Sequence, residues 1–152
     1  MWLELKEEIE IELNELQSLF IEFKPLMIKV QSDIPNFIET VALAGLLHSF
    51  YTGIENIFKR VVLNLDDSVP RSETWHIQIL NSMVTQSANR PAVISASLRD
   101  KLTIFLQFRH VFRHAYSFYL QWNKMKPLVL ECENTLKQLE KEITKFLEKI
   151  NS

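Results

Sequence analysis

Apolar residues recur three and four positions apart over long stretches of this 152-residue chain, and this spacing constrains the fold more than any other feature. The first such stripe is made of Leu5, Ile9, Leu13, Leu16, Phe20, Phe23, Met27 and Val30. The same steps return near the end of the chain, from Cys132 to Ile150. A stripe with this period is the mark of a helix with one buried face. The chain has only two glycines, which also favours helices because an interior glycine costs about 1 kcal/mol relative to alanine. An all-α fold is therefore predicted.

Proline and capping residues divide the first half of the chain into two expected helices. The first should run to about Val30, with a bend at Pro25. The second should begin near Pro35, because proline suits the first helical turn, and should continue to about Leu63. Small side chains on one face of this second helix predict close packing against another helix; they are Ala42, Gly45, Ser49 and Gly53.

Three further helices are expected in the second half. The third should begin after Ser72 and end near Asn89, before an extended link at Arg90-Pro91. Ser95 or Ser97 can cap the fourth, and Pro127 either interrupts that helix or begins the fifth. Five helices with short connections predict one up-and-down bundle over residues 1–152. The apolar stripes of the first and last helices can pair within one chain or with a second chain.

Several features favour a cytoplasmic protein. The start of the chain mixes acidic and aliphatic residues without a basic flank, so no secretory signal is expected. The longest weakly polar run, Thr40 to Ile54, has about 15 residues, fewer than the roughly 20 that a membrane-spanning helix needs. Cys132 is the only cysteine, so no internal disulfide can form and a reducing compartment is predicted.

Chemically versatile side chains cluster in the fourth helix. Within about two helical turns this apolar helix carries Arg109, His110, Arg113, His114 and Tyr116. The surrounding segment, residues 61–130, is also the basic part of the chain, with eight Lys or Arg against four Asp or Glu. A phosphate-rich ligand is therefore expected here.

A metal site in this cluster is not expected. His110 and His114 are four residues apart and share a helix face, as zinc ligands can. Zinc proteases, however, carry Glu directly after the first such histidine, where this chain has Val111, and Arg113 would repel a cation. No cofactor is predicted.

Acid–base chemistry on a phosphodiester is the stronger interpretation, because Arg109 can hold a phosphate and His114 can transfer a proton near neutral pH. RNA suits such a pair, since its deprotonated 2′-hydroxyl can attack the adjacent phosphorus without a metal. On a straight helix the two side chains point about 140° apart. Either the helix is distorted or a second chain contributes, and a twofold homodimer would bring two arginines and two histidines to one cleft.

The spacing Arg109-x4-His114-x-Tyr116 resembles the Arg-x4-His-x-Tyr motif of HEPN toxins, in particular HepT of the HepT–MntA toxin–antitoxin systems. The segment from Leu46 to Glu55 resembles the second helix of HepT-like proteins, and Trp75-His76 and Arg90-Pro91 are similar in the same order. The likeness covers roughly residues 38–125.

This resemblance implies a toxin: a metal-independent endoribonuclease with its cleft at the interface of a homodimer and Arg109 and His114 as catalytic residues. By the same analogy transfer RNA is a candidate substrate. The resemblance also implies an MntA-like nucleotidyltransferase antitoxin that adds AMP to Tyr116. His110 and Arg113 are expected to support RNA binding, and Glu55 to orient a motif side chain. Two alternatives stay open, a non-catalytic HEPN module that binds RNA or a nucleotidyltransferase, and a purely structural oligomer.

Overall fold

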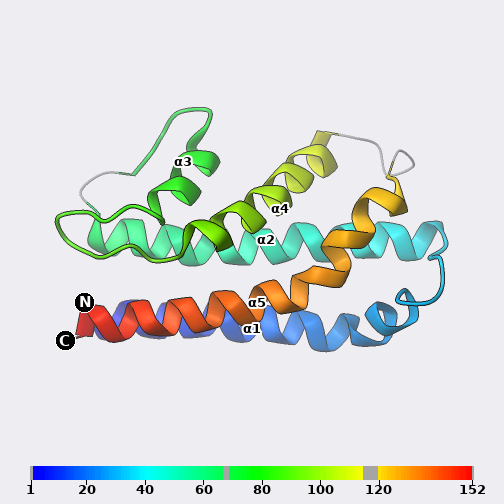
Figure 1. The fold of residues 1–152 in the computed structure, drawn as a ribbon, viewed down its shortest axis with the longest axis horizontal. Helices are drawn as coiled ribbons and strands as arrows, with labels where there is room; N and C mark the ends of the chain where they lie inside the picture. The colour runs from blue at the N-terminus through cyan, green and yellow to red at the C-terminus, as the bar shows by residue number, and fades with distance from the viewer. Residues whose placement is uncertain (1, 67–68, 115–119, 152) are drawn as a thin grey trace.

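The computed structural model describes residues 2–66, 69–114 and 120–151, apart from the side chains of Trp2 and His114. Five α-helices follow one another in this part of the chain, which contains no strand. They are α1 (Trp2–Lys29), α2 (Phe37–Leu65), α3 (Trp75–Ser82), α4 (Ala96–His114) and α5 (Trp122–Asn151) (Figure 1). The predicted all-α bundle of five helices is confirmed.

Helix α2 is the centre of the bundle and packs against each of the other four helices. In Figure 1, α1 and α5 run side by side below α2, whereas α3 and α4 lie toward its other side. Polar contacts join α1 to α5, among them an ion pair between Lys24 and Glu133 at 3.1 Å. The first and last helices therefore pair within one chain in this structure.

The start of α2 is set by a reciprocal cap. The side chain of Asn36 accepts a hydrogen bond from the backbone N–H of Glu39 at 2.8 Å, and the carboxylate of Glu39 accepts one from the backbone N–H of Asn36 at 3.0 Å. This capping box satisfies two donors that a helix start leaves unpaired. Pro35 lies just before the cap and not in the first helical turn, so its predicted role is wrong although the helix begins within two residues of the predicted position.

The two glycines of α2 lie in different surroundings. A Cβ atom on Gly53 would lie 2.6 Å from Cδ2 of Leu16, so the Leu16 side chain of α1 packs directly against the backbone of α2 at this point. At Gly45 nothing lies within 4 Å of such an atom, and Ser49 is exposed. The prediction of close packing along the whole strip of small residues is correct at Gly53 and wrong at Gly45.

Helix α3 ends at Ser82, seven residues before the predicted end at Asn89. The reason is Arg90, whose side chain is buried and donates to both carboxylate oxygens of Asp66, at 2.8 and 3.1 Å. The same guanidinium donates to the backbone carbonyls of Ser82, Thr85 and Pro91. Carbonyls that a longer helix would use are therefore taken by Arg90, and the chain turns back toward α2.

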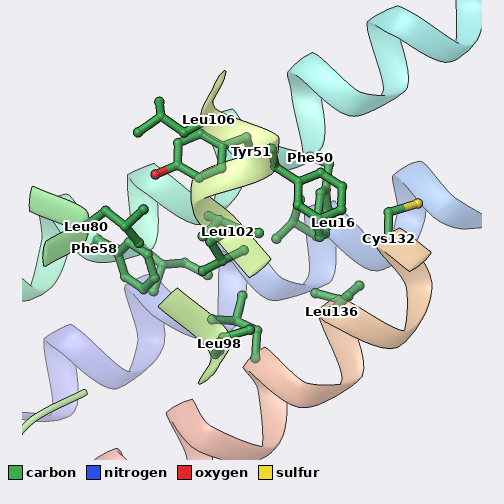
Figure 2. Close-up of a cluster of buried hydrophobic side chains, with 14 of the residues drawn as sticks. Leu16, Phe50, Tyr51, Phe58, Leu80, Leu98, Leu102, Leu106, Cys132 and Leu136 are labelled. Atoms are coloured by element: carbon green, nitrogen blue, oxygen red, sulfur yellow. The ribbon is translucent and has the colours of Figure 1, made fainter. Parts of the chain in front are cut away.

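Helix α4 begins after Ser95, whose hydroxyl accepts a hydrogen bond from the backbone N–H of Leu98 at 3.1 Å. Of the two predicted caps, Ser95 is correct. Figure 2 shows the inner face of α4, where Leu98, Leu102 and Leu106 point into the core beside side chains of the other helices. Pro127 lies inside α5, five residues after its start, so the prediction that it interrupts the fourth helix or begins the fifth is wrong.

Cys132 lies on the inner face of α5 and is fully buried. Its Sγ–H donates to the backbone carbonyl of Val129 at 3.1 Å. Burial raises the pKa of the Cys132 thiol to about 12, and the carboxylate of Glu133 acts in the same direction. The thiol therefore stays protonated at neutral pH.

By length and composition α2 is apolar enough to cross a membrane, contrary to the sequence-based expectation that no segment is. Half of its most apolar window is buried inside the bundle. The central helix of a water-soluble bundle meets the same criterion, because it contacts other helices on most of its faces.

Candidate active site

A groove of about 640 Å³ separates α3 from α4. Its described lining contains three arginines, two histidines and one acid; they are Arg99, Arg109, Arg113, His76, His110 and Glu73. The floor is apolar and includes Leu80 and Leu106. A groove with a cationic rim and an apolar floor suits a ligand that carries both phosphate and a flat base.

Arg109 on the wall of this groove is held from α2. Its Nη1 donates to Oε1 of Glu55 at 3.2 Å, and the two side chains are only 6% and 4% exposed. Thr52 Oγ1 accepts a second, longer hydrogen bond from Nη1 at 3.4 Å, and the guanidinium lies 5.3 Å from the ring centroid of Tyr51. The charge of Arg109 is thus balanced by one carboxylate and its position is fixed by α2.

His76, in the first turn of α3, joins the same cluster. Its Nδ1 lies 2.7 Å from Oε2 of Glu55 and 2.8 Å from Nη2 of Arg109. One ring nitrogen has a single in-plane position, so it either donates to the carboxylate or accepts from the guanidinium. Oε2 of Glu55 can only accept and has no other donor among the described residues, whereas the guanidinium of Arg109 already donates to Glu55 Oε1 and Thr52 through Nη1. We therefore assign the Nδ1–H tautomer, which donates to Glu55 and leaves Nη2 of Arg109 close to Nδ1 without a hydrogen bond to it.

The residues predicted from the sequence are distributed as follows. Arg109 and Glu55 are in direct contact, 54 residues apart in the chain. His110 and Arg113 are exposed and line the groove. His114 is the last residue of α4, but its side chain lies outside the described part, as does the whole of Tyr116.

Three residues of this cluster have no role predicted from the sequence, namely His76, Thr52 and Tyr51. His76 was named only, with Trp75, as part of the family resemblance. Its pairing with Glu55 spans 21 positions and depends on how α3 packs on α2. The one local signal was Glu55 itself, an acid on an otherwise apolar helix face, because a buried carboxylate requires a partner.

Two buried polar atoms near Arg109 have no hydrogen-bond partner among the described residues, Tyr51 Oη and His48 Nδ1. Burial raises the pKa of Tyr51 far above its ordinary value. Burial lowers the pKa of His48, and the positive charges of Arg109 and Arg113 lower it further. Both side chains are therefore neutral at neutral pH and add no charge beside Arg109.

Within the described ranges no three His, Cys, Asp or Glu side chains are placed to hold a metal ion. What the cluster does offer is a fixed guanidinium and an imidazole that share one buried carboxylate. This combination can bind a phosphate and exchange a proton next to it.

The family model described as HepT-like protein matches residues 42–150. This range contains Glu55, His76 and Arg109 and covers more than half of the chain. No curated protein and no solved structure matches the chain. The HepT-like resemblance of the sequence and the family match agree, and the chain belongs to the HepT-like family of HEPN-domain proteins.

Proposed function

We propose that this protein is a metal-independent endoribonuclease of the HEPN toxin type. The observation that carries the proposal is the position of Arg109, held by Glu55 on the wall of a groove with a cationic rim. Membership of the HepT-like family supports it. The fold alone fixes no activity, so the proposal depends on this site.

In this proposal Arg109 binds the phosphate of the RNA backbone. A guanidinium has five N–H donors. Nη1 donates to Glu55 and Thr52. With the His76 proton on Nδ1, three donors of Arg109 make no hydrogen bond to a described residue, two on Nη2 and one on Nε. One from each of these nitrogens suits two oxygens of one phosphate. Fixed positive charge there stabilises the charge that develops on phosphorus in the transition state.

Proton transfer is assigned to His114. The 2′-hydroxyl loses its proton to a base, its oxygen attacks phosphorus, the bond to the 5′-oxygen breaks, and that oxygen takes a proton from an acid. The products are a 2′,3′-cyclic phosphate and a 5′-hydroxyl. A homodimer with the cleft at its interface would supply one His114 imidazole as base and a second as acid.

The regulatory part of the proposal concerns Tyr116. It follows Arg109 by seven residues in the sequence, and it lies outside the described part of the chain. An MntA-like nucleotidyltransferase antitoxin would transfer AMP from ATP to the Tyr116 hydroxyl, with loss of the hydroxyl proton and release of pyrophosphate. The added phosphate and bulk would compete with RNA for Arg109. We further propose that the protein acts in the cytoplasm, away from membranes, with transfer RNA as one substrate.

A non-catalytic module that binds RNA or a nucleotidyltransferase is the second candidate. One observation favours it: Arg109 is only 5% exposed and already neutralised by Glu55, so a phosphate has to compete with a buried carboxylate. This candidate predicts RNA binding without cleavage.

The test is to incubate unmodified protein with total RNA in excess EDTA, and to analyse the ends of any fragments. Mass spectrometry first excludes AMP on Tyr116. The variants are His114→Ala, which removes the proposed proton carrier, and Lys141→Ala, which removes one exposed charge from α5 outside the groove. Cleavage by wild type and Lys141→Ala but not by His114→Ala supports the ribonuclease. Binding with intact RNA in every tube favours the second candidate.

A further inference from the structure

We infer that His76 is a second proton-transfer residue of this site, acting as the general base toward the RNA 2′-hydroxyl, with Glu55 as its positioning residue. The inference rests on the proposed ribonuclease function and specifies its chemistry. It assigns a role to a side chain outside the Arg-x4-His-x-Tyr motif.

The tautomer of His76 follows from its contact with Glu55. The carboxylate oxygen Oε2 lies 2.7 Å from Nδ1 and has no other donor among the described residues, whereas Arg109 has acceptors in Glu55 Oε1 and Thr52, so we place the ring proton on Nδ1. The lone pair is then on Nε2, the nitrogen that has to take up a proton in a general base. A carboxylate that fixes an imidazole in this way also stabilises the imidazolium formed when the proton arrives.

The second ring nitrogen is available to a substrate. Nε2 makes no hydrogen bond to any described residue. It is also not one of the fully buried polar atoms without a partner, so it is accessible from the groove. The side chain is 24% exposed and lines the groove between α3 and α4. The Trp75 ring lies 3.6 Å from the imidazole between centroids, and Lys59 Nζ lies 4.4 Å from the Trp75 ring. These contacts restrict the orientation of the His76 ring.

The position of Arg109 makes the geometry specific to a phosphodiester. Its Nη2 lies 2.8 Å from the His76 ring, so a phosphate bound by the free donors of Arg109 is adjacent to the imidazole. In RNA the 2′-hydroxyl is attached next to the 3′-phosphate, so it enters the same space. Two charged side chains contact His76 directly, Glu55 from α2 and Arg109 from α4. The other titratable or charged residues that line the groove are Glu73, Arg99, His110 and Arg113.

The step balances as follows. Nε2 of His76 takes the 2′-hydroxyl proton while the 2′-oxygen forms a bond to phosphorus. The bond between phosphorus and the 5′-oxygen breaks, and that oxygen takes a proton from His114, whose role becomes that of the acid. A cyclic phosphate and a 5′-hydroxyl leave. Solvent then removes the proton from His76 and restores the one on His114.

The experiment compares single-turnover cleavage of one RNA oligonucleotide in EDTA by wild type and by variants His76→Ala, His76→Gln and Gln78→Ala. Gln78 is the matched control, because it is exposed on the same helix and lines a different pocket. Thermal unfolding of each variant establishes that it is folded. Binding is measured separately, with an oligonucleotide whose 2′-hydroxyls are replaced by hydrogen and which therefore cannot be cleaved.

We expect both His76 variants to lose about 10²- to 10⁴-fold in rate, the usual contribution of a general base, while their affinity for the non-cleavable oligonucleotide is unchanged. The acidic limb of the pH–rate profile should disappear, added imidazole should restore part of the rate in His76→Ala, and Gln78→Ala should match wild type. Wild-type cleavage by His76→Gln, or a rate loss explained by weaker binding, would overturn the inference and leave the ribonuclease proposal intact. No cleavage by unmodified wild type would overturn both.

Discussion

Replacing Glu55 with leucine should destabilise the protein strongly, because it leaves the guanidinium of Arg109 buried without its counter-ion. Both side chains are more than nine-tenths buried and only 3.2 Å apart. Removing one partner of such a pair typically costs about 3–5 kcal/mol. For a chain of this size about 1 kcal/mol lowers Tm by about 2–4 °C, so Tm should fall by roughly 6–20 °C. Arg109→Met should lower the free energy of unfolding by a similar amount. The loss should be somewhat smaller, because Glu55 keeps its hydrogen bond with His76.

The double variant Glu55→Leu/Arg109→Met separates the charge from the packing. It removes both ions and keeps most of the side-chain volume, and such replacements are often neutral or stabilising. We expect it to unfold within about 1 kcal/mol of wild type, the typical scale for a volume-conserving change. The unfolding free energies of wild type, the two single variants and the double variant then give the coupling energy between Glu55 and Arg109.

The assay is urea unfolding followed by circular dichroism at one protein concentration, because dimer formation would make stability depend on concentration. Glu133→Leu is the matched control, since the ion pair of Glu133 with Lys24 is 33% and 53% exposed and should contribute at most about 1 kcal/mol. A free-energy loss in Glu55→Leu no larger than in Glu133→Leu would contradict this prediction, as would a double variant in which the losses of the two single variants simply add.

Three further predictions concern single positions, each measured by urea unfolding. Gly53→Ala should lower the free energy of unfolding by about 1–3 kcal/mol, because the new Cβ would lie 2.6 Å from the Leu16 side chain. Gly45→Ala should leave it unchanged or raise it by up to about 1 kcal/mol, because nothing lies within 4 Å of the new atom. Equal effects of the two substitutions would contradict the tight contact at Gly53. Asn36→Ala should cost about 0.5–2 kcal/mol by removing the cap of α2, and no loss would mean that water replaces it. Since the pKa of His48 is lowered from 6.5, the unfolded chain binds a proton that the folded chain does not, so stability should fall as pH drops below about 6.5. This loss should be smaller in His48→Asn.

The fold could be predicted from the sequence because its signals are local. The three- and four-residue spacing of apolar side chains predicts the helices, and Ser95, one of the two predicted caps, lies at the start of α4. The cap of α2, Asn36, was not predicted. The end of α3 could not be predicted in this way. It depends on Arg90, which reaches Asp66 across 24 positions, and no local pattern near Asn89 reports that contact.

The same difference between local signals and long-range contacts applies to the candidate site. Arg109, His110 and Arg113 could be selected because they are concentrated in one apolar helix, which is visible in the sequence. His76 could not be assigned a role, because a single imidazole at the start of a short helix is unremarkable until Glu55 and Arg109 surround it. The roles assigned to Arg109, His114 and Tyr116 stay predictions.

Because Cys132 is buried, the rate at which its thiol is alkylated reports how often the helical bundle opens. Alkylating reagents react with the thiolate, which this buried side chain does not form at neutral pH in the folded state. Labelling therefore has to wait until α5 separates from the bundle, and as the only cysteine in the chain it gives a single signal. The labelling rate at low reagent concentration can then be followed in cell extract as well as in purified protein. A ligand that binds only the folded chain should lower the labelling rate by the factor 1 + L/Kd, where L is the free ligand concentration.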